Sequence, residues 1–128
     1  MSGIVGIVRE GYRPAAPLLL YGLFALQHRG QETAGMATLN HNHLSMKKGT
    51  GLLSSIFVDD SVHALAGDRG LGHVKYGEYR RYDKEQPILP KEFNIKGIHC
   101  LLSLDGNILN PGFSLGEMTD KLGRNPEE

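Results

Sequence analysis

The chain has 128 residues, enough for one domain with a single core but too few for a second catalytic domain. Its 14 basic and 14 acidic side chains cancel, which argues against nucleic acid or an anionic membrane as the main partner. No apolar stretch approaches the roughly 20 residues of a membrane span, and the N-terminus has no secretory pattern, so we expect a cytoplasmic protein. The single cysteine, Cys100, excludes an internal disulfide and a cysteine-based zinc site.

The first third of the chain predicts a strand followed by a helix. Residues 2–8 form a β-branched run broken by two glycines, typical of a buried strand. Residues 9–14 are polar and marked by glycine and proline, which favours a turn. A helix is predicted from Pro17, with leucines at steps of three and four residues and Gly30 at its end.

The middle of the chain predicts a hairpin and a second helix. Residues 33–39 and 43–48 are β-like and flank Asn40, His41 and Asn42, which are turn-forming types. Ser54 is a candidate cap for a helix that continues to about Ala66 and stops at Gly67.

The last part predicts two more strands and a final helix. Residues 70–76 and 98–104 are the strands, a charged loop separates them, and Cys100 is expected to be buried and inert in the second. Asp105-Gly106 predicts a tight turn, and a capping box begins a helix over residues 114–123. The hairpins indicate antiparallel or mixed sheet.

Three weaker motifs support no site. The acidic pair Asp59-Asp60 is not followed by a phosphate-binding loop, so we interpret it as part of a solvent-exposed helix face. Gly49-Thr50-Gly51 is too short to indicate nucleotide binding. His41 and His43 lack nearby carboxylates or thiols, so no metal is expected. We expect no cofactor.

One segment carries a specific resemblance. Residues 26–37 read LQHRGQETAGMA, which closely resembles the LQHRGQESAGIA signature of the amidophosphoribosyltransferase family of purine biosynthesis. Shorter pieces match in the same order, namely residues 3–7, 48–52, 72–74 with Tyr76, and 106–107.

This resemblance implies an α+β fold of the N-terminal-nucleophile type, an αββα sandwich of two antiparallel sheets between helical layers. About the first half of that sandwich is represented, so residues 1–128 are expected to be a single, partial class II glutamine amidotransferase-like domain without a phosphoribosyltransferase domain. In the family this domain hydrolyses glutamine and delivers ammonia to the separate phosphoribosyltransferase domain.

The resemblance also implies a site with altered chemistry. The family's nucleophile is an N-terminal cysteine whose own amine is the base, and Ser2 stands at that position. The arginine that binds the substrate carboxylate in GHVRYST is Lys75 here, followed by Tyr76, Gly77 and Glu78. Lysine keeps the charge but loses the bidentate fork, and Glu78 adds a negative charge where the substrate carboxylate would approach.

The family's oxyanion donors lie in the segment HNGN, which reads Leu104-Asp105-Gly106-Asn107 here. A carboxylate therefore replaces the asparagine donor, while the Gly106 amide remains. The family's aspartate for the substrate amino group falls beyond Glu128. Arg29 belongs to the signature and is expected in the same pocket.

Three functions remain open. One is a glutamine amidotransferase-like protein with lost or weakened glutaminase activity that binds glutamine, glutamate or a partner, as a homo-oligomer or in a complex with a second protein chain. The second is an active glutaminase subunit that uses Ser2 as its N-terminal nucleophile. The third is a structural or interaction module without a ligand.

Overall fold

The computed structural model describes residues 2–76 and 88–105 of the chain. The predicted turn at Asp105-Gly106 is only half included, and the predicted helix over residues 114–123 lies outside the described part. The elements in chain order are β1 (Ser2–Val8), α1 (Ala16–Ala25), η1 (Gln27–Arg29), β2 (Thr33–Asn40), β3 (His43–Thr50), α2 (Leu53–Ile56), η2 (Asp59–Val62), β4 (Arg69–Lys75), β5 (Lys91–Ile95) and β6 (Ile98–Leu102).

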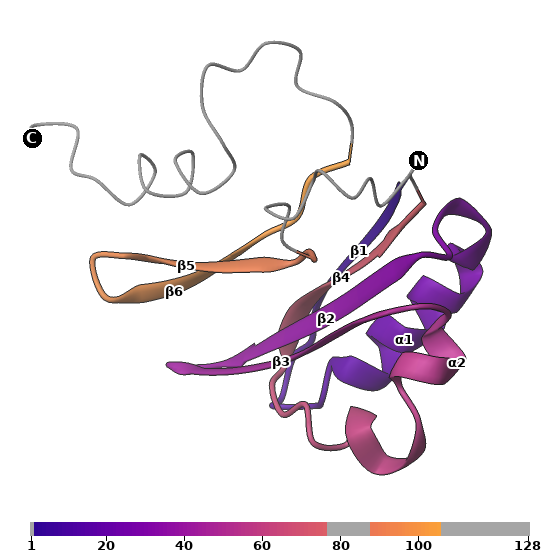
Figure 1. Ribbon diagram of the computed structural model, residues 1–128. Coiled ribbons are helices and arrows are strands. Elements are labelled where there is room, and N and C mark those ends of the chain that lie inside the picture. The colour runs from indigo at the N-terminus through magenta and orange to yellow at the C-terminus, as the bar shows by residue number, and fades with distance from the viewer. Residues whose placement is uncertain (1, 77–87, 106–128) are drawn as a thin grey trace, which may run out of the picture.

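The strands form two antiparallel sheets. The larger has the order β1-β4-β2-β3, and β5 pairs with β6 in a separate two-stranded sheet. The two helices lie on one side of the larger sheet and the β5–β6 hairpin lies on the other (Figure 1). The described part is thus α+β, with antiparallel sheets and few helices, as the sequence predicts.

The core lies between α1 and the larger sheet. Leu19 and Leu23 are completely buried, and glycines on the facing strand make room for them. A Cβ at Gly70 would lie 2.9 Å from Leu19 Cδ1, and one at Gly72 would lie 2.8 Å from Leu23 Cδ1. Because side chains alternate along a strand, His73 and Lys75 point to the opposite face, toward β6.

The first helix is shorter than predicted. Its α-helical part ends at Ala25, and the chain continues to Gly30 as the 3-10 turn η1. Gly30 turns back against β4, where a Cβ would lie 2.4 Å from Lys75 N. This close approach, rather than a regular helix end, explains the glycine.

The prediction of one helix from Ser54 to Ala66 is wrong. The region contains α2 and η2, separated by Phe57 and Val58, and Leu52 rather than Ser54 precedes the helix, without a side-chain cap. Val58 is extended, with ψ of 151°, so the chain breaks and returns Val62 to the core. No helix reaches the predicted stop at Gly67, which instead turns the chain into β4 with φ of +135°.

Two further differences concern the second sheet. Strand β5 was not predicted, although residues 92–95 alternate polar and apolar, because the segment is only five residues long and follows a charged segment. Cys100 was expected to be buried, but it is only half-buried in β6.

Candidate functional site

A row of polar residues crosses one end of the larger sheet. The strand register places Ser2 beside Lys75, Lys75 beside Thr33, and Thr33 beside Thr50. Ser2 and Thr33 are buried, while Lys75 is half-buried. Residues paired across neighbouring strands share a face, so these side chains project toward the side of β6. Three hydroxyls and an amine therefore line one face of the sheet at the end where the first strand begins.

Arg29 joins this row to Asp105. Its Nε donates a hydrogen bond of 2.8 Å to the Ser2 carbonyl, and its Nη2 lies 3.7 Å from Asp105 Oδ2. Both side chains of this ion pair are more than a third exposed, so its contribution to stability is small, about 0–1 kcal/mol. Its importance is positional, because one guanidinium contacts both Ser2 and Asp105.

The turn that carries Arg29 is fixed by side-chain bonds of Gln27. Gln27 Nε2 donates to the Gly30 carbonyl, and Gln27 Oε1 accepts from the Leu53 amide at 3.0 Å. The Glu32 amide then donates to the Lys75 carbonyl at 3.1 Å. These bonds connect the end of η1 to α2 and β4, which holds the Arg29 backbone beside the start of β1.

His73 lies two residues before Lys75 on β4, on the same face as this polar row, and is 1% exposed. Its Nδ1 is 3.3 Å from Ser103 Oγ, and its Nε2 has no hydrogen-bond partner among the described residues. Burial lowers the pKa of His73 to about 4, the charge of Asp105 opposes that shift, and the charge of Lys75 adds to it. His73 is therefore neutral near pH 7.

His73 and Ser103 were missed by the sequence reasoning. Together they tie β4 to the segment that ends in Asp105, across 30 residues of sequence. A histidine between Gly72 and Val74 gives no local sign of such a contact. Its position two residues before Lys75 on one strand was the available signal, since such residues share a face.

The structure brings together Ser2, Arg29 and Asp105, with Lys75 beside Ser2. Tyr76 follows β4 and is 49% exposed, so it lies at the rim of this region. Gly77 and Gly106 fall outside the described residues. We call the group Ser2, Arg29, Lys75 and Asp105 the polar cluster.

Within the described ranges, no group of three or more histidine, cysteine, aspartate or glutamate side chains is arranged to hold a metal ion. In the same part of the chain, no helix is both long and apolar enough to cross a membrane.

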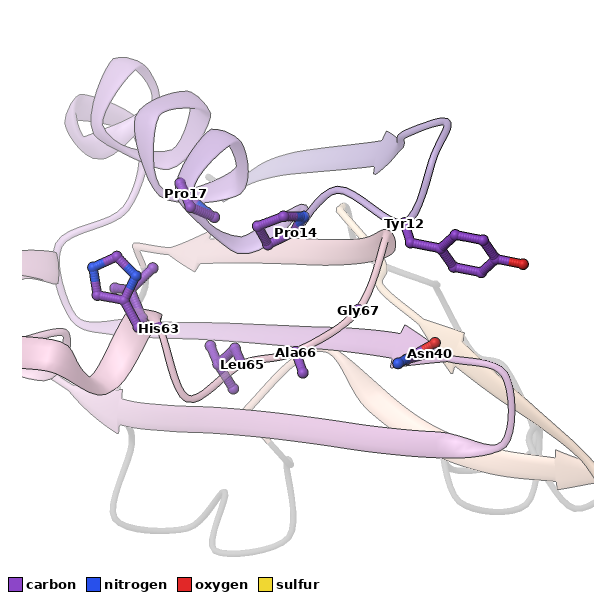
Figure 2. Close-up of a pocket in the computed structure, with 9 residues that line it drawn as sticks. Tyr12, Pro14, Pro17, Asn40, His63, Leu65, Ala66 and Gly67 are labelled. Atoms are coloured by element: carbon purple, nitrogen blue, oxygen red, sulfur yellow. The ribbon is translucent and has the colours of Figure 1, made fainter.

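A hollow of about 240 Å³ lies at the opposite end of the larger sheet from Ser2. Figure 2 shows Pro14 and Pro17 on one bounding segment and Leu65 and Ala66 on the other, with the Tyr12 ring pointing away. Its full lining is Tyr12, Pro14, Pro17, Asn40, Val62, His63, Leu65, Ala66 and Gly67. Its walls mix apolar and polar groups, and it includes none of the polar cluster.

Comparison with known proteins identifies relatives. The chain is 38% identical to the amidophosphoribosyltransferase of Archaeoglobus fulgidus over 112 residues, or 86% of this chain and 24% of that protein. It is 37% identical to the enzyme of Methanothermobacter thermautotrophicus over 127 residues, or 96% of this chain and 26% of that protein. The chain thus spans about a quarter of the length of these curated relatives. No protein-family model matches it.

Solved structures agree with these relatives. The glutamine phosphoribosylpyrophosphate amidotransferase of Bacillus subtilis, solved with ADP and GMP, superimposes with a TM-score of 0.59 at 32% identity, over 73% of this chain and 19% of that one. A structure described as the allosteric regulatory enzyme of purine biosynthesis also gives 0.59, at 28% identity, over 75% of this chain and 20% of that one.

The antiparallel α+β fold and these matches define a glutamine amidotransferase-like domain of class II. More particularly, the chain is related to the glutaminase domain of amidophosphoribosyltransferase.

Proposed function

We propose that this domain binds glutamine or glutamate at the polar cluster and has lost most of its relatives' glutaminase activity. The observation that carries the proposal is the Arg29 guanidinium, which contacts both the Ser2 carbonyl and the Asp105 carboxylate. An ionised carboxylate only accepts hydrogen bonds, so Asp105 has no proton for a developing oxyanion. A missing donor of this kind typically costs about a hundred- to a thousandfold in turnover.

Ligand binding does not need a nucleophile or an oxyanion donor. The polar cluster keeps charged and hydroxyl groups that are suited to binding. Lys75 offers a positive charge to an α-carboxylate, and the Ser2 and Thr33 hydroxyls lie in the same row. Arg29 can also turn from Asp105 to a ligand carboxylate, because both groups of the ion pair are partly exposed. These features support an amino-acid ligand with a carboxylate.

Calorimetry of the full chain with L-glutamine and L-glutamate tests this proposal, together with an assay for released ammonia. We expect saturable binding of one of these ligands without ammonia release. Lys75→Gln should weaken binding by about tenfold or more, since a hydrogen bond between charged groups contributes about 1.5–3 kcal/mol. Lys47→Gln on β3 is the matched control and should bind normally. Ammonia release that is abolished by Ser2→Ala would refute the proposed loss of activity. If neither glutamine nor glutamate binds, the proposed ligand is wrong.

The second candidate is an active glutaminase subunit that uses Ser2 as an N-terminal nucleophile. Its support is the position of Ser2 at the start of a buried strand beside Arg29 and Lys75. This mechanism requires a free Ser2 amine, which acts as the base. Sequencing the N-terminus of purified protein tests this candidate, because a retained Met1 leaves no such amine and would exclude it.

The third candidate is a module that acts only through contacts with another chain. It predicts that neither glutamine nor glutamate binds, and that Lys75→Gln and Lys47→Gln behave alike. The calorimetry and the ammonia assay described above together separate all three candidates.

A further inference from the structure

The ion pair of Arg29 and Asp105 presents a hydrogen-bond donor and an acceptor side by side. Arg29 Nη2 lies 3.7 Å from Asp105 Oδ2, beyond the usual length of about 2.7–3.2 Å for an N–H···O hydrogen bond. A guanidinium has several N–H donors and a carboxylate accepts several hydrogen bonds, so this contact leaves capacity on both groups. The two side chains are 43% and 37% exposed, which gives a small ligand access to both.

Both members of this ion pair are held in place by contacts outside the pair. Arg29 Nε donates to the Ser2 carbonyl at 2.8 Å, which orients the guanidinium. Ser103 Oγ lies 3.3 Å from Nδ1 of the buried His73, and Asp105 follows Ser103 by two residues. Groups that are positioned before a ligand arrives lose less conformational freedom when it binds, so the pair is suited to recognition.

The chemical group that matches this ion pair is a primary carboxamide. A carboxamide carries an N–H donor and a carbonyl acceptor on the same carbon, so it can donate to Asp105 and accept from Arg29 at the same time. A carboxylate or an ester offers acceptors without a donor, and an ammonium group offers donors without an acceptor. In addition, Asp105 repels a carboxylate and Arg29 repels an ammonium group. A neutral amide therefore satisfies both members of the pair.

We propose that the Arg29–Asp105 pair selects glutamine by binding its side-chain carboxamide, with the amide N–H on Asp105 and the amide oxygen on Arg29. This inference rests on the proposed function, and it narrows the ligand from glutamine or glutamate to glutamine. The α-carboxylate stays with Lys75, which pairs with Ser2 in the strand register, while Ser2 is also bonded to Arg29. Neighbouring strands are about 4.8 Å apart, a distance that the three carbons between the carboxylate and the carboxamide of glutamine can bridge.

Asp105 is the residue that makes this recognition selective. An asparagine of the same size would offer its own N–H donor as well as an acceptor, so it could also bind the oxygen of an ester or a carboxylate. The Asp105 carboxylate only accepts, and the ligand must therefore supply the donor. A site of this kind rejects analogues that lack the donor, because its own polar group is then left unpaired.

Calorimetry of the full chain with four amino acids tests the selection. L-Glutamine offers a donor and an acceptor at the end of its side chain, L-glutamate and its γ-methyl ester offer acceptors alone, and L-ornithine offers donors alone. We expect glutamine to bind at least about tenfold more tightly than each of the other three, because hydrogen bonds to charged groups are the stronger ones.

A variant of Asp105 tests whether this residue is responsible. Asp105→Asn should abolish most of the preference for glutamine over the γ-methyl ester, because asparagine supplies a donor for the ester oxygen. Asp60→Asn is the matched control, since Asp60 is an exposed residue on η2, and it should keep the preference. The measured quantity is a ratio of two affinities in one protein, which partial unfolding leaves unchanged because it lowers both apparent affinities alike.

Equal binding of glutamine and the γ-methyl ester, or an unchanged preference in Asp105→Asn, would overturn the selection by Asp105. Tighter binding of glutamate than of glutamine would show that Arg29 binds a carboxylate, which overturns this inference and leaves the proposed amino-acid site intact. Tighter binding of ornithine would overturn the role of Arg29. If none of the four amino acids binds, the proposed function fails together with the inference. The two failures are thus distinguishable.

Discussion

At the scale of single residues, Arg29 connects two members of the polar cluster. It bonds to the backbone of Ser2 and pairs with Asp105, so a neutral side chain at position 105 would change both the donor set and this contact. The glutamine hydrolysis that we propose to be lost therefore depends on two positions, the nucleophile at residue 2 and the oxyanion donor at residue 105.

Restoring both positions should restore hydrolysis. We predict that Ser2→Cys with Asp105→Asn releases ammonia from glutamine about a hundredfold faster than Ser2→Cys alone, because the asparagine amide supplies an oxyanion donor. A coupled ammonia assay measures the rates, after sequencing has established that Met1 is absent from both proteins. The control Ser2→Ala with Asp105→Asn should be inactive. Equal rates for the single and double variants would show that residue 105 is not the missing donor.

His73 should make the domain sensitive to mild acid. The unfolded chain binds a proton at this histidine near pH 6.5, whereas burial lowers the folded pKa to about 4. Stability is thus complete above pH 6.5 and is lost as the pH falls from 6.5 to 4, by roughly 3 kcal/mol. Urea unfolding across this range should give a steeper pH dependence for the unaltered chain than for His73→Asn. Parallel curves would contradict a neutral, buried His73.

At the scale of elements, two close approaches hold the second sheet and the η1 turn against the larger sheet. At Gly35 of β2, a Cβ would lie 2.2 Å from the Leu89 carbonyl oxygen. At Gly30 the corresponding distance to Lys75 N is 2.4 Å. Backbone rather than side chain opposes both glycines, so neither contact can relax by a rotamer change.

Gly35→Ala should therefore destabilise the fold by about 3 kcal/mol, through overpacking of β2 against the segment before β5. Gly6→Ala is the control, because its Cβ would meet only the flexible end of Leu71 at 3.2 Å. We expect that variant to remain within about 1 kcal/mol of the parent. Denaturant unfolding of both variants at one protein concentration measures the difference, and equal stabilities would contradict the close approach at Gly35.

At the scale of the whole molecule, the two sheets differ in the number of strands and in the packing that stabilises them. The larger sheet has four strands and is covered by α1, whereas the smaller consists of β5 and β6 alone among the described residues. An isolated hairpin is only marginally stable, so the smaller sheet depends on its contact with β4.

Hydrogen exchange should reveal this difference. Amides of β5 and β6 should exchange at least about a hundredfold faster than those of β4 and β2, because the hairpin can open without unfolding the core. Mass spectrometry of peptides from each strand measures the rates. Similar protection in both sheets would show that they unfold as one unit.

The sequence by itself determined the elements with strong local signals. The strand of residues 2–8, the hairpin after Thr33 and the strand before Tyr76 are confirmed, because β-branched runs and turn residues act over a few positions. The resemblance carried by residues 26–37 identified the family. Local signals failed between Ser54 and Ala66, where apolar residues must reach the core and an extended Val58 breaks the helix.

Only the tertiary structure decided which distant residues meet. Arg29 bonds to Ser2 across 27 residues of sequence, and His73 contacts Ser103 across 30. The sequence around one partner does not indicate the other partner, because these contacts depend on the strand order and on the turn after α1. Among the described strands the same order places β1 next to β4 alone, which no pattern within its seven residues could determine.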